Sequence, residues 1–206
     1  LPPLVASLRE AHFPGSAGGA AVLAPWEDRT SPHLRRLAFE ELVEYQSALA
    51  QRRREREARP APRIEADAVP RKKLASALPF PLTLSQKQAI REIGADLRSG
   101  RPMARLLQGD VGSGKTIVAV LTALLAAGRG YQSALLAPTT LLAEQHAETA
   151  ARLLAETGAR PALLTGRVTG RPRSALLAAV AEGQVDLLVG THALLERPVA
   201  FRRLGL

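Results

Sequence analysis

The chain has 206 residues, of which 46% are hydrophobic and 23% are charged, with 28 Lys and Arg against 19 Asp and Glu and no cysteine. This composition is typical of one globular domain and part of another, and it excludes wholesale disorder, a disulfide scaffold and a cysteine zinc site. No apolar run reaches about 18 residues, the length of a membrane span, and no secretory signal opens the chain, so we expect a cytoplasmic protein. The net charge of +9 fits nucleic-acid binding and simple solubility equally well.

Residues 1–30 are predicted to be irregular, because prolines punctuate them and residues 15–19 read Gly-Ser-Ala-Gly-Gly. A helix is predicted from Pro32 to Arg59. Apolar residues recur along it at three- and four-residue steps and predict a face that packs on another element: Leu34, Leu37, Ala38, Leu42, Tyr45 and Leu49. Its last turns alternate Arg and Glu, which is typical of a solvated face. Residues 60–81 contain five prolines and a basic run, and they are interpreted as a linker.

From residue 82 onward, helical and strand patterns alternate. Thr83 and Gln86 have the spacing of a capping box, and the helix that they begin is expected to end at Gly100. Its apolar face is formed by Ile90, Ile93 and Leu97. Short apolar runs predict strands at 103–108, 133–137, 161–164 and 185–189, and longer runs predict helices at 114–127, 141–156 and 173–182. Such alternation is typical of a parallel sheet covered on both faces, so the predicted fold class is α/β.

Residues 109–116 match the phosphate loop G-x-x-x-x-G-K-[ST] at every defined position. A predicted strand precedes the loop and a predicted helix follows it, so amides at the helix N-terminus converge where the helix dipole also favours an anion. The candidate nucleotide-binding residues are Gly109, Asp110, Val111, Gly112, Ser113, Gly114, Lys115 and Thr116. Lys115 is expected to reach the β- and γ-phosphates and the Thr116 hydroxyl to bind Mg²⁺, which makes these two the catalytic candidates. The alternative is a glycine-rich turn that only connects a strand to a helix.

A phosphate loop also needs an acidic residue for Mg²⁺, normally an Asp at the carboxyl end of a neighbouring strand. Asp186 precedes its apolar run, which places its carboxylate at the opposite end of the sheet. Asp110 lies inside the loop, where the chain wraps the phosphates. We therefore expect incomplete hydrolytic machinery in a chain that begins at Leu1 rather than Met and is expected to be a piece of a longer protein.

Four segments resemble motifs I, Ia, Ib and Ic of superfamily 2 DNA helicases: residues 109–116, 134–146, 164–166 and 189–195. The spacing and the residues of these segments closely resemble those of the RecG-type ATP-dependent DNA helicases. Residues 12–14 and 36–42 resemble the segment that joins the wedge domain of that family to its first motor lobe. Transcription-repair coupling translocases have a very similar motor and remain the alternative, which segments 12–14 and 36–42 make less favourable.

The resemblance implies a RecA-like motor lobe whose parallel sheet is incomplete. It divides the chain into the tail of an upstream DNA-binding wedge domain (1–31), a linker helix (32–59), a proline-rich basic linker (60–81) and the N-terminal, ATP-binding part of the first motor lobe (82–206). It also places the Asp-Glu box and the second motor lobe beyond Leu206, which would explain the missing acidic residue.

The resemblance assigns Gln86 to adenine recognition, which we favour, although a glutamine at this position of a capping box could also simply cap its helix. It assigns contacts with DNA phosphates to residues at the carboxyl ends of predicted strands, where ligands of α/β sheets bind: Thr139, Thr140, Thr165, Gly166, Thr191 and His192. A threonine at such a position also serves as a helix N-cap, so the structural interpretation stays open.

The resemblance implies a helicase that couples ATP hydrolysis, with Mg²⁺, to the remodelling of branched DNA and stalled replication forks in recombination and repair. The protein is expected to be monomeric, with single-strand-binding protein as a candidate partner. The chain alone is expected to be inactive, and a non-catalytic nucleotide- and DNA-binding module stays open. A GTPase is disfavoured, because its Asn-Lys-x-Asp guanine motif cannot occur in a chain without asparagine.

Overall fold

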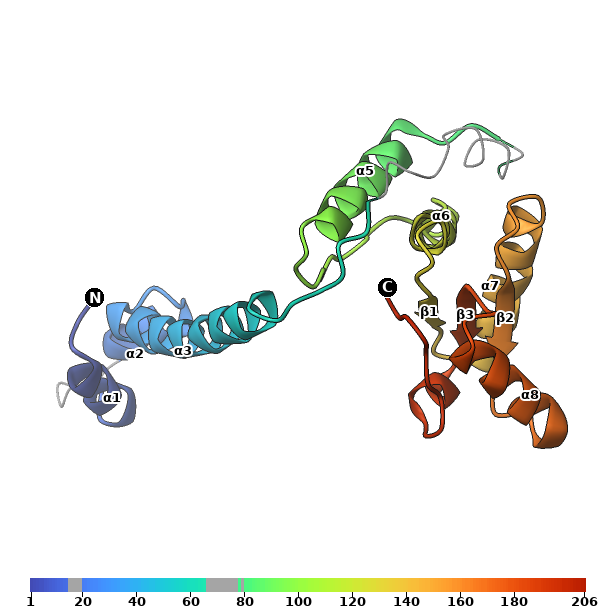
Figure 1. Cartoon of the computed structure of the whole chain (residues 1–206). Coiled ribbons are helices and arrows are strands. Elements are labelled where there is room, and N and C mark those ends of the chain that lie inside the picture. The colour runs from blue at the N-terminus through green and yellow to red at the C-terminus, as the bar shows by residue number, and fades with distance from the viewer. Residues whose placement is uncertain (15–19, 66–77, 79) are drawn as a thin grey trace. The chain divides into compact units, whose positions relative to one another are not determined.

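A computed structural model describes residues 1–14, 20–65, 78 and 80–206, and the chain divides into two compact units, Leu1–Ala58 and Arg59–Leu206 (Figure 1). The predicted linker at 60–81 and the glycine-rich run at 15–19 fall largely or wholly outside the described residues. Within the described ranges, no helix has the length and apolar character needed to cross a membrane.

The first unit contains helices α1 (Leu4–His12), α2 (Ala20–Glu27) and α3 (Pro32–Glu57). Ser31 caps α3, because its side chain accepts hydrogen bonds from the amides of His33 and Leu34. Pro32 occupies the first helical position, where the missing amide costs nothing. α1 packs on α3, and the buried Ser7 hydroxyl there donates to the Pro3 carbonyl and lies 3.2 Å from Nδ1 of His33.

The prediction that residues 1–30 are irregular is wrong, because α1 and α2 occupy much of this segment. Pro3 is the N-cap of α1 and Pro14 follows its C-cap, so these prolines border the helix and do not interrupt it. Pro25 lies inside α2, and its carbonyl accepts from the amides of Thr30 and Ser31, which closes the turn into α3.

The predicted apolar face of α3 is only partly covered. Leu34 and Leu37 are half-buried near α1, whereas Leu42, Tyr45 and Leu49 on the following turns are exposed. The expectation that the whole face packs on another element is therefore met only at the start of the helix.

The second unit is built on a parallel sheet of strands β1 (Ser133–Leu136), β3 (Leu187–Gly190) and β2 (Pro161–Leu164), in that spatial order. Helices α7 (Thr140–Leu154) and α8 (Gly170–Ala181) connect the strands, and the short 3-10 helix η2 (His192–Leu195) follows β3 (Figure 1). Gly190 pairs with both neighbouring strands, and a Cβ there would clash with the Leu164 carbonyl oxygen. The predicted α/β class and its parallel sheet are confirmed.

Both faces of the sheet are buried. Leu187 and Val189 belong to a cluster formed with α7 and with α6 (Lys115–Ala127), whereas Leu188 packs with residues of α8 and η2. Helix α5 (Leu84–Arg98) forms a further layer, in which the predicted apolar face of Ile90, Ile93 and Leu97 packs on α6. α6 is therefore buried on two sides, which explains why nearly all of its residues are apolar.

The predicted strand at 103–108 is not formed. Met103 and Leu107 pack on the α5–α6 cluster, whereas Leu106 is 85% exposed. No strand in the described part of the chain lies beside this segment to supply a hydrogen-bond ladder, so its partly buried apolar side chains pack on helices instead. The other predicted elements of this unit lie within three residues of the observed ones. α8 begins earlier than predicted because Pro172 fits the first turn of a helix.

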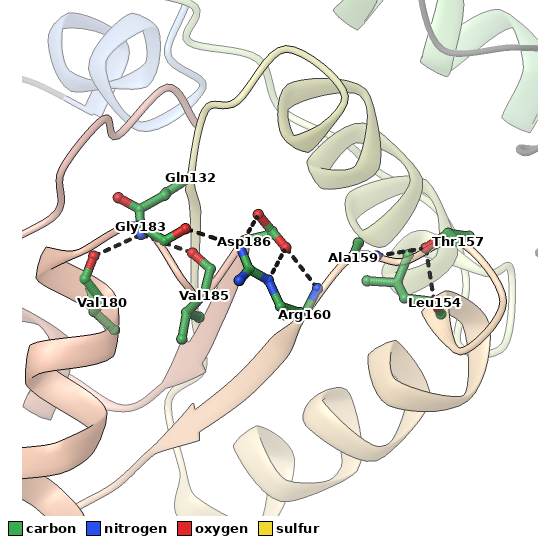
Figure 2. A network of polar contacts seen from close by, with 9 residues as sticks. All are labelled: Gln132, Leu154, Thr157, Ala159, Arg160, Val180, Gly183, Val185 and Asp186. Carbon is green, nitrogen blue, oxygen red and sulfur yellow. Dashed lines mark hydrogen bonds and ion pairs between the residues drawn. The ribbon is translucent and has the colours of Figure 1, made fainter.

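Gln132 joins the outer edge of β1 to the last residues of the chain. Its amide donates to the Arg203 carbonyl at 2.7 Å, and its carbonyl accepts from the amide of Gly205 at 2.9 Å, so residues 203–206 run parallel to β1. The buried side-chain amide donates to the carbonyls of Val180 and Val185, at 2.9 and 2.8 Å (Figure 2). Its Oε1 accepts from the Arg203 amide at 3.1 Å.

Candidate functional site

The phosphate loop at residues 109–116 leads directly into α6. Gly114 is the N-cap of the helix and has a φ of +83°, in the left-handed region, and a Cβ there would clash with the side chain of Gln86. The Gly114 carbonyl accepts from the amides of Ile117 and Val118, while those of Lys115 and Thr116 have no acceptor among the described residues. These two amides, at the positive end of the helix dipole, are suited to an anion.

Lys115 is folded back onto its own loop. Its Nζ donates to the carbonyls of Gly109 and Asp110, both at 2.7 Å. The ammonium group therefore already has two carbonyl oxygens as hydrogen-bond acceptors. A phosphate group would have to replace them. Thr116, on the first turn of α6, is half-buried.

Gln86 connects α5 to the phosphate loop. The capping box predicted for Thr83 is present, because Oε1 of Gln86 accepts from the Thr83 amide at 2.9 Å and the Thr83 hydroxyl accepts from the Gln86 amide at 3.2 Å. The side-chain Nε2 donates to the Ser113 carbonyl at 2.9 Å. The second contact was not foreseen from the sequence, because it depends on how α5 packs on α6.

A groove of about 1130 Å³ lies between the first turns of α5, residues 106–109 and the phosphate loop. Gln86, Ser113 and Lys115 line it, together with Leu84 and Leu107. Its mixture of apolar walls with a few polar groups is typical of small-molecule sites.

Asp186 lies at the amino end of β3, as its place in the sequence predicts, and its carboxylate binds Arg160 there. Its Oδ2 accepts from the amide of Arg160 at 2.8 Å and from its guanidinium Nε at 3.1 Å (Figure 2). Across the described ranges, no group of three or more His, Asp or Glu side chains could hold a metal ion.

The predicted DNA-contact residues follow the carboxyl ends of three parallel strands and so lie at one edge of the sheet. Thr139 caps α7 by accepting from the Leu142 amide at 3.3 Å, which supports the structural interpretation of that residue. Gly166 and His192 are exposed, and Thr140 and Thr191 are half-buried. Thr165 is only 2% exposed, so its hydroxyl, contrary to the expectation, is placed inside the fold.

Arginines lie at this same edge in ion pairs that the motif search did not identify. Arg167 follows Gly166 and pairs with Glu144 of α7, with 3.2 Å between Nη1 and Oε1. Arg173 of α8 pairs with Glu196, with 3.1 Å between Nη2 and Oε2. Alternating patterns cannot reveal such pairs, because their members are 23 residues apart in sequence.

The phosphate loop, the helix that it caps and the parallel sheet together define a nucleotide-binding lobe of the P-loop class. The family model described as DEAD/DEAH box helicase matches residues 83–205, and the chain belongs to this family. Membership of this helicase family implies that the chain uses a nucleotide, and it agrees with the helicase motifs identified in the sequence.

Known relatives identify the type more closely. The chain is 40% identical over 204 residues to the ATP-dependent DNA helicase RecG of Aquifex aeolicus, a match that covers 99% of this chain and 25% of the relative. It is 48% identical over 183 residues to RecG of Treponema pallidum, covering 82% of this chain and 27% of the relative. A solved structure of RecG bound to a three-way DNA junction superposes with a TM-score of 0.75 at 40% identity, over 84% of this chain and 24% of that one. The predicted resemblance to RecG is confirmed, and the chain spans about a quarter of the length of these relatives.

Proposed function

We propose that this chain is the ATP-binding part of the first motor lobe, with its upstream segment, of an ATP-dependent helicase that acts on branched DNA in recombination and repair. The observation that carries the proposal is a complete phosphate loop at the head of α6 in a chain 40% identical to a RecG helicase over nearly its whole length. The same identity supports the RecG type over the transcription-repair coupling type.

In this proposal, Lys115 leaves the carbonyls of Gly109 and Asp110 and binds the β- and γ-phosphates, while the amides of Lys115 and Thr116 donate to phosphate oxygens. The Thr116 hydroxyl is the Mg²⁺ ligand. Mg²⁺, when bound, would neutralise the phosphates and orient them for attack. Gln86 reads the adenine edge from the groove beside the loop.

The four-region division of the chain, from the wedge-domain tail at 1–31 to the motor lobe at 82–206, belongs to the same proposal. The proposal also includes a monomeric state and a single-strand-binding protein as partner. It places the protein in the cytoplasm, where bacteria keep their DNA. DNA phosphates are bound by the exposed backbone and hydroxyl groups at the carboxyl edge of the sheet, such as those of Gly166 and Thr191.

The isolated chain should bind Mg·ATP weakly and should not turn it over. Lys115→Ala should abolish binding in calorimetry, because the loop loses its only positive side chain at the phosphates. Lys87→Ala, which removes a lysine from the exposed side of α5, is the matched control and should bind as the unmodified chain does. Unchanged affinity of the Lys115 variant would contradict the phosphate-loop assignment, and steady phosphate release would contradict the expected absence of turnover.

A further inference from the structure

The two arginine ion pairs at the carboxyl edge of the sheet share one arrangement. Arg167 and Arg173 both belong to the segment that follows β2, and their partners belong to the segments that follow the other two strands. Glu144 lies on α7, after β1, and Glu196 lies after η2 and β3. Each pair therefore joins two of the three segments that follow the strands at the edge that we assign to DNA.

The carboxylates of Glu144 and Glu196 present to the guanidinium groups the same chemistry as a DNA phosphate. Both carboxylate and phosphate offer negatively charged oxygens to the planar N–H donors of arginine. In the described part of the chain, each of these guanidinium groups has this one carboxylate as its hydrogen-bond acceptor. Arg171 lies between the two arginines in sequence, is exposed and has no ion pair within the described ranges.

Exposure determines how easily a phosphate could replace each carboxylate. The Arg167 side chain is 78% exposed, so its pair with Glu144 is weak and open to exchange. The Arg173 side chain is 21% exposed, whereas that of Glu196 is 62% exposed, so the carboxylate is the more mobile partner of the second pair. In both pairs the carboxylate can be displaced without opening the core.

We propose that Glu144 and Glu196 compete with DNA phosphates for Arg167 and Arg173 and so limit the affinity of this edge for DNA. The inference rests on the proposed function, because it requires DNA at the carboxyl edge. An arginine that always has an acceptor can exchange one phosphate for the next without passing through an unpaired state. Such exchange suits a protein that moves along DNA.

The test is fluorescence anisotropy of a labelled forked duplex, titrated at low salt with the 206-residue chain and its variants. Glu144→Gln and Glu196→Gln should each tighten binding by about two- to fivefold, the range that corresponds to an exposed ion pair. The gain should shrink as salt rises, because screening weakens the pairs. Glu148→Gln, one turn further along α7, removes the same charge from the same helix and should have little effect.

Double variants separate direct competition from a general change of charge. In an Arg167→Gln background, Glu144→Gln should give no further gain, and Arg173→Gln should likewise remove the gain of Glu196→Gln. Gains that persist in these backgrounds, or that Glu148→Gln reproduces, would overturn the proposal, as would weaker binding by either glutamate variant. If the arginine variants weaken binding and the glutamate variants change nothing, competition is wrong but the DNA-binding edge stands. If neither set has an effect, both proposals fail.

Discussion

Gln86 has both ends of its side-chain amide occupied. Oε1 accepts from Thr83 and Nε2 donates to the Ser113 carbonyl of the phosphate loop. The amide nitrogen has a second hydrogen and the oxygen a second lone pair, so a base in the adjoining groove could bond to Gln86 while both contacts remain. Adenine recognition and helix capping would then use the same side chain, and a substitution can separate them.

Gln86→Glu separates these uses. A carboxylate still accepts from the Thr83 amide and keeps the capping box, but it has no hydrogen to donate to Ser113 or to a base. If Gln86 reads adenine, the affinity for ATP should fall about two- to tenfold more than that for GTP, the effect of one lost hydrogen bond. The melting temperature should stay nearly unchanged. Fluorescent analogues of the two nucleotides give the ratio of the affinities for ATP and GTP. Repulsion between the new carboxylate and the phosphates weakens both nucleotides equally, so it does not change this ratio.

Thr83→Ala is the matched control for the cap. It removes the hydroxyl that accepts from the Gln86 amide and leaves the glutamine in place, so it should cost about 0.5–2 kcal/mol of stability and affect ATP and GTP equally. An unchanged ratio of affinities in Gln86→Glu would decide for the structural interpretation of Gln86.

At the scale of single residues, the sequence identifies chemistry that lies within a short segment. The phosphate loop needs eight consecutive residues, and the capping box needs Thr83 and Gln86 three residues apart, so both are visible in the chain. The bond from Gln86 to Ser113 spans 27 residues, and the burial of Thr165 depends on what covers the end of β2. Neither follows from local spacing, because both depend on how distant segments pack.

At the scale of elements, periodicity predicts the strands and helices of the second unit because their apolar faces are buried. It fails at 103–108, because a short apolar run can pack on helices as well as form a strand, and Met103 and Leu107 pack on the α5–α6 cluster. It also fails at α1, a short helix whose buried residue is Ser7 and whose exposed residues include Val5 and Leu8. An apolar stripe cannot indicate a helix that buries a serine.

Gln132 provides a test of how the elements of the second unit are joined. Gln132→Leu keeps a similar volume but leaves the Val185 carbonyl and the Arg203 amide without their partner, while the Val180 carbonyl keeps only the amide donors of its own helix end, such as Gly183. Buried groups without partners are costly, so the variant should lose about 2–4 kcal/mol in urea unfolding. Gln184→Leu, at an exposed position, should change stability by less than about 0.5 kcal/mol. Equal effects of the two variants would show that the buried network contributes nothing.

At the scale of the whole molecule, the net charge of +9 does not by itself locate a DNA-binding surface. Two arginine-rich regions are candidates. One is the end of α3, where Arg53 pairs with Glu57 at 2.8 Å and the hydrogen bond that the arginine donates to Glu57 raises the pKa of the arginine. The other is the carboxyl edge of the sheet, where Arg167 follows the exposed Gly166 and Arg171 is exposed in the first turn of α8. Edges of this kind are where α/β folds bind their ligands, whereas an exposed helical run of alternating charge is typically solvated.

Charge reversal at the two regions should therefore have unequal effects on DNA binding. The Arg167→Glu, Arg171→Glu variant should reduce affinity and lower the slope of log affinity against log salt, because two phosphate contacts and their released counterions are lost. The Arg53→Glu, Arg56→Glu variant changes the net charge by the same amount and should leave that slope nearly unaltered. Filter binding of forked and linear duplexes across a salt series measures both, and neither variant should discriminate between base sequences, since the contacts are to phosphates. A larger loss from the Arg53 and Arg56 variant would make α3 the DNA-binding element and would contradict the assignment of the strand-end loops.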